Sequence, residues 1–268
     1  MKGVVVGGTR SGVGKTVATL VIVRALQRAG RSVQPAKAGP DFIDPSHHAA
    51  VAGRPSRTLD CWLLGDNGLR ANYHRGEGDV CVVEGVMGLY DGDCSSTAMV
   101  ADALDLPVVL VVDGSAGMES VAATALGFRD YAATADRDVD VVGVVAQRTH
   151  GGRHERGIRD ALPKEMVFVG RIPPDDRLEV PERHLGLHGA GEAPVPGDAL
   201  DDAAATIDTD RLLDVVDEPA PQPESVLEAP PDSATVGVAR DDAFRFVYPG
   251  TIERLGGSGT VRTFSPVA

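Results

Sequence analysis

The sequence predicts an α/β fold built on a doubly wound, mostly parallel sheet, and three observations support this prediction. Short valine-rich runs are continuously apolar, as in strands that are buried on both faces. Helix-length segments separate these runs, so consecutive strands can join through right-handed β-α-β crossovers. The first run also leads directly into a glycine-rich loop. The five expected strands are Gly3–Val6, Asp79–Val83, Pro107–Val112, Val139–Val145 and Met166–Val169.

The loop 7–16 reads Gly-Gly-Thr-Arg-Ser-Gly-Val-Gly-Lys-Thr. Its glycines let successive backbone N–H groups point inward, and the following helix adds its positive N-terminal end, so the loop suits a phosphate. We expect Lys15 to contact the β- and γ-phosphates of ATP and the Thr16 hydroxyl to ligate Mg²⁺. The standard spacing would put glycine where this chain has Thr9, so the loop is a variant. The expected nucleotide-binding residues of the loop are Gly8, Thr9, Arg10, Ser11, Gly12, Val13, Gly14, Lys15 and Thr16.

The expected helix after the loop is Thr16–Ala29, with Gly30 at the position of a left-handed C-terminal cap. Arg10 lies five residues before Lys15, a position similar to that of the signature lysine in the dimeric MinD and ParA ATPases. Two interpretations of Arg10 stay open. It contacts a phosphate, across a dimer interface in one version, or it is a solvated loop residue.

Two acidic segments follow the phosphate loop. The segment Lys37–Pro45 contains two aspartates, Asp41 and Asp44, bracketed by prolines and glycine. We expect a rigid loop suited to cation coordination and substrate positioning. Glu84 comes at the end of a buried strand, where a carboxylate commonly anchors Mg²⁺ in phosphate-loop enzymes. Taken singly, each segment is better explained by a structural turn.

His47 and His48 follow the second of these aspartates directly. Both could be metal ligands, but adjacent histidines point in different directions. We therefore expect a substrate contact or a solvated turn at this pair.

The last part of the chain contains a short second module. Ala199–Val216 is expected to be a helix that ends a first domain, residues 1–216. Segment 217–233 is rich in proline and acidic residues, which is typical of a linker. About 35 residues cannot bury a core of their own, so we expect 234–268 to be the opening of a second domain; the alternative is an edge strand added to the main sheet. The expected elements of this module are the strands Thr235–Ala239 and Val261–Phe264 and the helix Pro249–Leu255.

Together the segments form long motifs, which read Lys-Ala-Gly-Pro-Asp-Phe-Ile-Asp-Pro from Lys37, Arg-Thr-Leu-Asp-Cys-Trp from Arg57 and Glu-Gly-Val-Met-Gly-Leu-Tyr-Asp from Glu84. In these motifs the chain closely resembles the cobyrinic acid a,c-diamide synthase family. The resemblance implies a P-loop NTPase fold of the MinD, ParA and dethiobiotin-synthetase type. It covers nearly the whole chain and continues through Pro107–Asp113, Val142–Arg148, Pro181–Leu187, Val236–Phe244 and Phe264–Pro266.

The resemblance implies an ATP-dependent carboxylate amide ligase of cobalamin biosynthesis. Such enzymes amidate the a and c acetate side chains of cobyrinic acid, a corrin, by way of acyl phosphates and with ammonia from glutamine. Phosphoryl transfer of this kind needs an in-line carboxylate, a metal on the phosphate oxygens and cations at the developing charge. By this likeness Thr16, Asp41 and Glu84 form the Mg²⁺ shell, and Lys15 stabilises the charge.

The resemblance also implies residues that meet the substrate. Lys37 is a candidate contact for the same developing charge or for a substrate carboxylate. Asp44 and Asp91 match family positions associated with substrate binding and the order of amidation. The residues implied as catalytic are Lys15, Lys37, Asp41, Asp44, Glu84 and Asp91.

The chain departs from the family pattern at two places. Gln147-Arg148 stands where the family commonly has Asn-Arg, so we expect these two residues at the adenine but with altered base selectivity. The family's glutamine amidotransferase domain, of class I, uses a nucleophilic cysteine and a histidine. The cysteines here lie at 61, 81 and 94, so we expect 234–268 to be a truncated start of that domain, with ammonia or a separate glutaminase supplying nitrogen.

Two alternative functions stay open. Nickel-sirohydrochlorin a,c-diamide synthase would share almost every motif. A ParA/MinD-like switch that dimerises with ATP belongs to another class, but such proteins need no substrate loop like Lys37–Pro45 and usually have lysine at the position of Arg10. A homodimer is expected in either case.

Composition bounds the partners and the compartment. The formal net charge is −13 over 268 residues, which argues against nucleic acid as a partner. Lysine occurs only at positions 2, 15, 37 and 164, and such an acidic, lysine-poor composition predicts adaptation to high salt. At molar salt the Debye length is about 3 Å, so the net charge would not repel an anionic substrate. No stretch approaches the ~18 apolar residues of a membrane span, and no signal peptide is evident, so we expect a cytoplasmic protein without a membrane partner.

Overall fold

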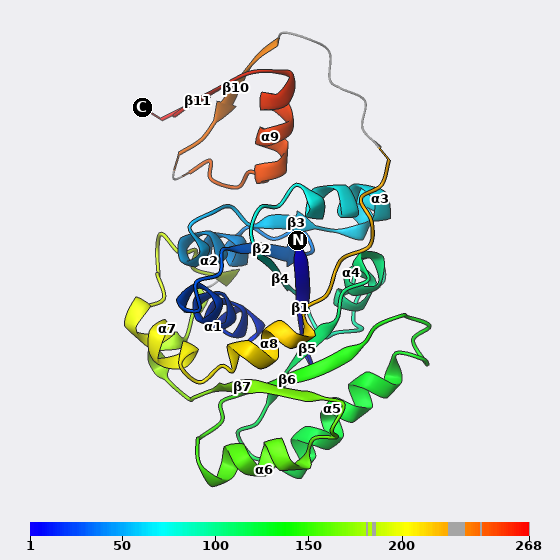
Figure 1. Ribbon diagram of the computed structural model, residues 1–268. Helices are drawn as coiled ribbons and strands as arrows, with labels where there is room; N and C mark the ends of the chain where they lie inside the picture. The colour runs from blue at the N-terminus through cyan, green and yellow to red at the C-terminus, as the bar shows by residue number, and fades with distance from the viewer. Residues whose placement is uncertain (181, 184–185, 225–233, 242, 268) are drawn as a thin grey trace. The chain divides into compact units, whose positions relative to one another are not determined.

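A parallel sheet forms the centre of residues Met1–Gln222 in the computed structural model, which describes residues 1–180, 182–183, 186–224, 234–241 and 243–267 (Figure 1). Its strands are β1 (Lys2–Gly8), β2 (Val33–Ala38), β3 (Arg57–Leu59), β4 (Val80–Glu84), β5 (Val108–Asp113), β6 (Val141–Gln147) and β7 (Val167–Ile172). Their order across the sheet is β3-β2-β4-β1-β5-β6-β7, and every pair is parallel. The chain leaves β1 toward β2 on one side and later builds β5 to β7 on the other. Ligands bind such sheets at this point of reversal, beyond the C-terminal ends of the strands.

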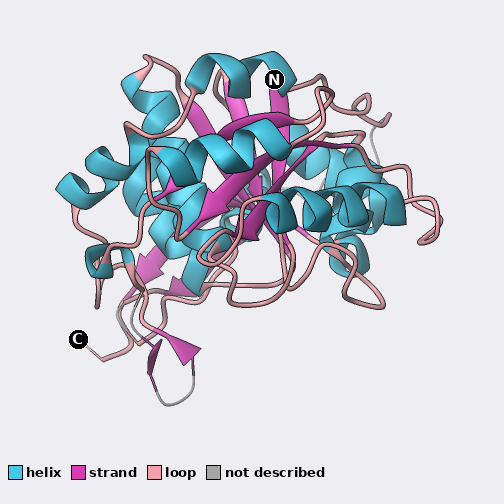
Figure 2. Cartoon of the chain, turned by 90° about the horizontal axis from the view of Figure 1, so that it is seen from below, coloured by secondary structure: helices cyan, strands magenta, loops and turns pink. Residues whose placement is uncertain are grey.

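Helices cover both faces of this sheet (Figure 2). The helices are α1 (Lys15–Arg28), α2 (Ile43–Ala52), α3 (Cys61–His74), α4 (Thr97–Leu104), α5 (Glu119–Tyr131), α6 (Arg153–Ala161), α7 (Gly197–Ala204) and α8 (Thr209–Val215). Helices α1, α2, α7 and α8 pack into one core and α3 to α6 into the other. Val4 and Val6 face the first core while Val5 faces the second, so both faces of β1 are buried. The predicted doubly wound α/β architecture is therefore confirmed.

The predicted helix Ala199–Val216 is wrong in its continuity. The structure has two separate helices, α7 and α8. Between them the backbone of Ile207 forms a bridge with Gly170 of β7, which interrupts the helix. Asp208 then caps α8 by accepting a hydrogen bond from the backbone N–H of Arg211 at 3.1 Å. A tertiary contact and a capping side chain together interrupt a segment whose apolar periodicity is continuous.

Residues Pro223–Ala268 form a second compact unit. The strands β10 (Ala234–Ala239) and β11 (Gly259–Phe264) pair in parallel, and α9 (Pro249–Ser258) connects them. The predicted β-α-β pattern is present, and its two strands pair with each other in a sheet of their own. Most side chains of β10 and β11 are half-buried or exposed, as expected for a unit with few residues to cover them. Part of the predicted linker, 225–233, lies outside the described residues, as does Asp242.

Within the motif Pro181–Leu187, the described residues form a small antiparallel pair, β8 (Glu182–Arg183) with β9 (Gly186–Leu187). Pro181, His184 and Leu185 lie outside the described residues.

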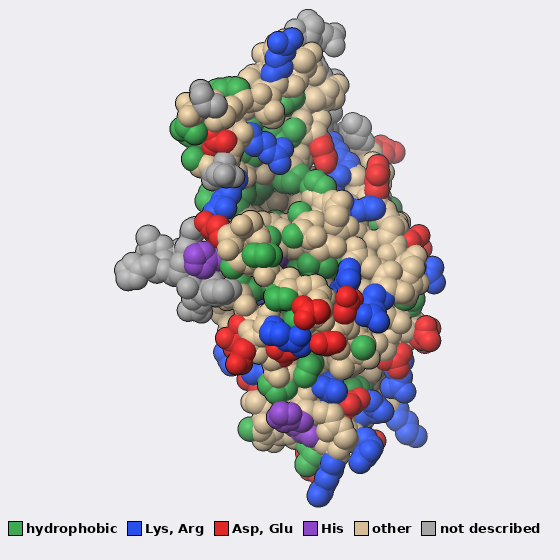
Figure 3. Space-filling model, turned by 90° about the vertical axis from the view of Figure 1, so that its left-hand side faces the viewer, with side chains coloured by type: hydrophobic (Ala, Val, Ile, Leu, Met, Phe, Trp, Pro, Cys, Tyr) green, Lys and Arg blue, Asp and Glu red, His purple; other side chains and the backbone are tan. Residues whose placement is uncertain are grey.

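Acidic and basic side chains intermix over one face of the molecule (Figure 3). Arginine makes the exposed ion pairs of α1 and α7: Arg24 forms a two-pronged contact with Asp201, with N–O distances of 2.8 and 2.9 Å. Arg28 reaches the same carboxylate at 3.0 Å. The planar guanidinium fits a carboxylate with two parallel hydrogen bonds, which an ammonium group does not.

Within the described residues, no helix combines the length and the apolar character that crossing a bilayer requires.

Candidate active site

The phosphate loop joins the end of β1 to the start of α1. Gly12 and Gly14 adopt left-handed backbone conformations, with φ values of 71° and 99°. A Cβ on Gly14 would also lie 2.7 Å from Nε2 of Gln147, so this position needs glycine for two independent reasons. Gly14 is the N-cap of α1, and no side chain caps its first turn. The free N–H groups of that turn are therefore available to an anion.

Lys15 begins α1 and lies almost entirely buried. Its Nζ donates hydrogen bonds to the carbonyl of Met87 and, at 3.3 Å, to the carbonyl of Arg10. Burial, with a smaller contribution from the nearby charge of Lys37, lowers the pKa of Lys15 to about 8. A carboxylate or phosphate beside this ammonium would raise the pKa again. Lys15 is thus held by neutral carbonyl oxygens at the place that the sequence predicts for phosphate.

Glu84 ends β4 with its side chain 1% exposed. One carboxylate oxygen, Oε1, accepts hydrogen bonds from the Thr16 hydroxyl at 2.8 Å and from the Lys37 ammonium at 3.2 Å. The other, Oε2, contacts Nε2 of His48. Burial alone would raise the pKa of Glu84, but the charge of Lys37 and the hydrogen bond from His48 outweigh burial and hold it well below its usual range. Glu84 therefore stays ionised.

Lys37 lies opposite Glu84 on the neighbouring strand β2 and also contacts Asp44 Oδ2 at 3.1 Å. Two buried carboxylates thus compete for one ammonium. Glu84 has Thr16 and His48 as further donors, so it keeps its charge. Burial and the charge of Glu84 raise the pKa of Asp44 to about 8, against the opposing effect of Lys37. Near neutral pH the geometry favours a proton on Asp44, despite the short contact with Lys37.

The predicted loop Lys37–Pro45 is wrong at both ends. Lys37 belongs to strand β2, and Asp44 and Pro45 belong to the first turn of α2. Only the middle of the segment is a loop, and there Asp41 Oδ1 accepts a hydrogen bond from the backbone N–H of Ile43 at 2.8 Å. Asp41 thus fixes the start of α2 while its carboxylate also lines the cavity described below.

One of the two alternatives for His47 and His48, a solvated turn, is wrong, while a substrate contact at this pair stays a prediction. Both lie in α2 and are buried. His47 Nε2 lies 2.8 Å from the carbonyl oxygen of His188. His48 reaches the candidate site through Glu84, a contact that the sequence analysis did not predict. A signal existed: on a helix, positions 44 and 48 share one face, but the segment was not recognised as helical.

One cavity of about 860 Å³ collects these side chains. Residues from the phosphate loop, from β2 and α2, and from the end of β4 line it together with a segment after β7. The lining includes Lys15, Thr16, Lys37, Asp41, Asp44, Glu84, Gln147 and Arg148. The first six of these residues are predicted site residues from three distant segments of the sequence. They line the same cavity as Gln147 and Arg148, the two residues predicted at the adenine.

The donor set of this cavity fits Mg²⁺ bound with a nucleotide. The Thr16 hydroxyl and a Glu84 carboxylate oxygen, 2.8 Å apart, are the hard oxygen donors that Mg²⁺ prefers. Among the described residues, no three His, Cys, Asp or Glu side chains gather as a metal cage. Mg²⁺ commonly uses one or two protein oxygens and completes its shell with water and phosphate, so a sparse donor set is what it requires. The metal roles of Thr16, Asp41 and Glu84 stay predictions.

Comparison with known proteins decides the family. Residues 4–187 match the family model described as the CobQ/CobB/MinD/ParA nucleotide binding domain. The chain belongs to this family. The match includes the phosphate loop, Glu84 and Gln147, so the predicted P-loop fold of the MinD and ParA type is confirmed.

Relatives of known name match the whole chain. A cobyrinate a,c-diamide synthase of Halobacterium salinarum is 64% identical over 100% of this chain and 60% of its own length. One from Haloarcula marismortui is 59% identical over 100% of this chain and 62% of its own length. A hydrogenobyrinate a,c-diamide synthase of Brucella anthropi is 38% identical over 100% of this chain and 64% of its own length. The chain thus spans less than two thirds of these relatives. The first two sources agree with the high-salt adaptation that the composition predicts.

In this nucleotide binding domain, Gln147 and Arg148 lie at the end of β6. Gln147 is buried, and its Oε1 has no hydrogen-bond partner among the described residues. Arg148 donates to Asp113 Oδ2 at 2.7 Å, and this hydrogen bond lowers the pKa of Asp113 to about 2. Pro173–Val180 supplies much of the same wall, and sequence reasoning missed both Asp113 and this segment. The unpaired Oε1 is an acceptor available to a ligand amine.

Five of the predicted residues are not among the described residues that line the cavity: Gly8, Thr9, Arg10, Val13 and Asp91. Val13 is instead buried in the hydrophobic core that contains α1. Asp91 is exposed and is not among the described residues that line the cavity, although its charge acts on Lys15. Arg10 is exposed as well, and its guanidinium lies 3.7 Å from Asp113 Oδ2. Both interpretations of Arg10 therefore stay open.

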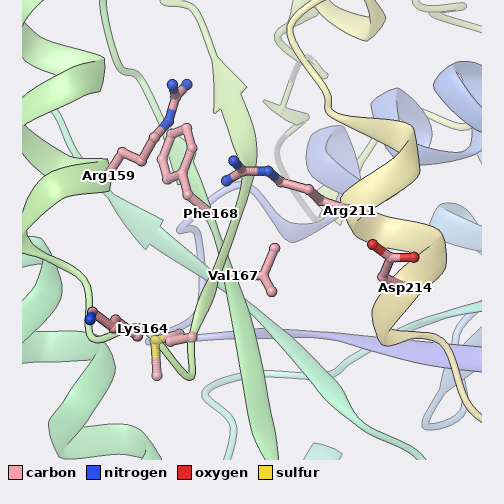
Figure 4. A pocket seen from close by; sticks show the side chains of 7 residues that line it. Arg159, Lys164, Val167, Phe168, Arg211 and Asp214 are labelled. Atoms are coloured by element: carbon pink, nitrogen blue, oxygen red, sulfur yellow. The ribbon is translucent and has the colours of Figure 1, made fainter.

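A smaller cavity of about 320 Å³ lies beside the edge strand β7 of this domain (Figure 4). The Arg159 guanidinium lies over the ring of Phe168, 5.3 Å from its centre. Arg159 and Arg211 pair with Glu155 and Asp208. With its arginines already engaged, this cavity is a weaker candidate site than the one at the phosphate loop.

Proposed function

We propose that the protein amidates the a and c acetate carboxylates of cobyrinic acid, using ATP and ammonia. The observation that carries the proposal is one cavity that joins a phosphate loop to Lys37, Asp41 and Asp44, a charged set beyond what nucleotide binding alone requires. The names of the relatives that match the whole chain support the substrate class. From the resemblance at Val236–Phe244 and Phe264–Pro266, residues 234–268 are proposed to belong to a glutamine amidotransferase-like domain. The chain spans about 60% of the first relative's length.

The proposed chemistry has two steps. A substrate carboxylate oxygen attacks the γ-phosphorus of ATP, ADP leaves, and an acyl phosphate forms on the substrate. The nitrogen of ammonia then attacks the acyl carbon, inorganic phosphate leaves, and the nitrogen loses a proton to solvent. The buried ammonium of Lys15 would stabilise charge on the transferring phosphoryl group. Mg²⁺, held by Thr16 and Glu84, would supply charge neutralisation at the phosphates.

Lys37 and Asp44 would face the substrate carboxylate. A protonated Asp44 can donate a hydrogen bond to a carboxylate that an ionised aspartate would repel. Lys37 carries the positive charge on the other side. This pairing of one neutral acid and one ammonium suits recognition of an anionic acetate arm in a buried place.

The test is amide formation by the purified chain in molar KCl. The chain is incubated with MgATP, cobyrinic acid and ammonium, and mass spectrometry follows the products. We expect a monoamide and then a diamide, because ammonium supplies the nucleophile without a glutaminase. Glutamine in place of ammonium shows whether this chain releases ammonia by itself. Nickel-sirohydrochlorin in place of cobyrinic acid tests the related substrate.

Matched variants make the result specific. Lys15→Ala should reduce the amidation rate by about 10²–10³-fold, the usual loss when one charge-stabilising donor is removed. Lys164→Ala changes an exposed lysine that does not line the cavity at the phosphate loop, so it should leave the rate unchanged. An ATP-dependent dimer that makes no amide from either tetrapyrrole would overturn the proposal and favour a MinD-like switch.

A further inference from the structure

His48 sits behind the candidate metal ligand and touches it. Its ring is fully buried in α2, and Nε2 lies within hydrogen-bond distance of Glu84 Oε2. On its other side, Nδ1 lies 3.1 Å from the hydroxyl oxygen of Ser56. Ser56 is itself 2% exposed and comes just before β3. Three buried side chains therefore form one chain of contacts, Ser56–His48–Glu84. They come from the residue before β3, from α2 and from the end of β4.

The direction of these hydrogen bonds follows from their chemistry. An ionised carboxylate only accepts, so Nε2 of His48 must carry the proton that it shares with Glu84. In the neutral ring, Nδ1 is then an acceptor, and the Ser56 hydroxyl donates to it. Glu84 thus determines the tautomer, and the contact with Ser56 holds the other side of the ring in place.

The two oxygens of Glu84 have different partners as a result. Oε1 accepts from Thr16 and Lys37, both of which line the cavity. Oε2 is held by His48, which does not line it. Rotation of the carboxylate would break the contact with His48 and move Oε1 away from Thr16. His48 therefore fixes the orientation of the Glu84 carboxylate, so that its other oxygen faces the phosphate loop.

We propose that His48 is a positioning residue that orients Glu84 Oε1 toward Thr16 for divalent-metal binding, with Ser56 holding the far side of its ring. The proposal rests on the part of the proposed function in which Glu84 and Thr16 hold Mg²⁺ with a nucleotide. Partners that orient metal ligands typically change metal affinity by about 10–100-fold when they are removed. A purely structural histidine would instead affect stability and leave the metal affinity of the folded protein unchanged.

The test measures Mn²⁺ binding to the full chain in the presence of ADP, by electron paramagnetic resonance of free Mn²⁺. His48→Gln keeps an amide nitrogen near the place of Nε2, whereas His48→Asn is too short to reach Glu84. We expect His48→Asn to weaken Mn²⁺ binding by about 10–100-fold and His48→Gln to restore most of the affinity. ADP binding in excess EDTA should be equal in all three proteins, because the phosphate loop is untouched.

Ser56→Ala gives a second test that leaves the ring in place. It should weaken Mn²⁺ binding less than His48→Asn does, and it decides the question if His48→Asn does not fold. Wild-type Mn²⁺ affinity in folded His48→Asn, or in Ser56→Ala when His48→Asn does not fold, would overturn the proposal, as would equal losses in His48→Gln and His48→Asn. The measurement needs no tetrapyrrole. If wild type binds Mn²⁺ and ADP but forms no amide, the proposed substrate fails while the role of His48 stands.

Discussion

Lys37 and Glu84 face each other across adjacent parallel strands, with Nζ 3.2 Å from Oε1 and both side chains buried. The register of β2 against β4 sets this pair, since residue 37 is the direct partner of residue 84. A buried ion pair tolerates the loss of one member poorly, because the remaining charge has neither water nor a counter-ion. The same two residues therefore contribute both to the stability of the sheet and to the candidate site at the C-terminal ends of its strands.

Removing either member of this pair should lower the free energy of unfolding. Lys37→Met should lower the free energy of unfolding by about 3–5 kcal/mol, because Glu84 loses its ammonium partner. Glu84→Gln should also destabilise the protein, because it leaves Lys37 with only Asp44. The double variant should lose less than the sum of the two singles, since neither charge is then left alone. Urea unfolding in molar KCl measures all three.

The control for this cycle is Lys164→Met, which changes an exposed lysine. Its free energy of unfolding should stay within about 0.5 kcal/mol of wild type. Strict additivity of the two single effects in the double variant would contradict a direct pair between residues 37 and 84.

Asp44 should make stability fall as pH rises. Its pKa is raised from 3.8 to about 8, so between these values the folded protein holds a proton that the unfolded chain releases. The free energy of unfolding therefore decreases with increasing pH across this window, and the stabilisation from this proton is fully present only below it. Asp44→Asn is neutral at every pH and should remove this part of the slope. Urea midpoints at pH 5, 7 and 9 would show it; parallel profiles for wild type and variant would contradict it.

Gly14 and Gly30 form a matched pair of left-handed glycines, with φ values of 99° and 80°. Either alanine variant should lose about 1 kcal/mol of stability from backbone strain. Gly14→Ala should in addition weaken nucleotide binding, because its Cβ would lie 2.7 Å from Gln147 Nε2 and displace a side chain that lines the cavity. Gly30→Ala meets open space and should bind nucleotide normally. Fluorescent-nucleotide titration and thermal melting separate the two effects; equal affinities would contradict this account.

Most of the fold could be predicted because its strands are buried on both faces. Continuous valine runs mark β1 and β4 to β7 within a few residues. Strand β2 was given no bounds, since Gln34, Pro35 and Lys37 break its apolar run, and β3 has only three residues. These strands owe their pairing to the neighbours β4 and β2 rather than to local propensity.

The site divides in the same way. Lys15 and Thr16 follow from the loop, because glycine spacing and a helix start are local properties. The contacts of Asp44 with Lys37 and of His48 with Glu84 did not follow, because they depend on α2 beginning at Ile43 and on the register of two strands. The pKa of Asp44 could not be foreseen either, since it arises from burial beside a second carboxylate.

The sequence by itself determined the layered α/β fold and the phosphate loop, because hydrophobic periodicity and glycine conformational freedom are properties of neighbouring residues along the chain. Only the tertiary structure decided how Lys37, Asp44, His48 and Glu84 share their charges and protons. Those choices depend on burial and on distances between strands and helices that are far apart in the chain, where electrostatic interactions are strong because water is excluded.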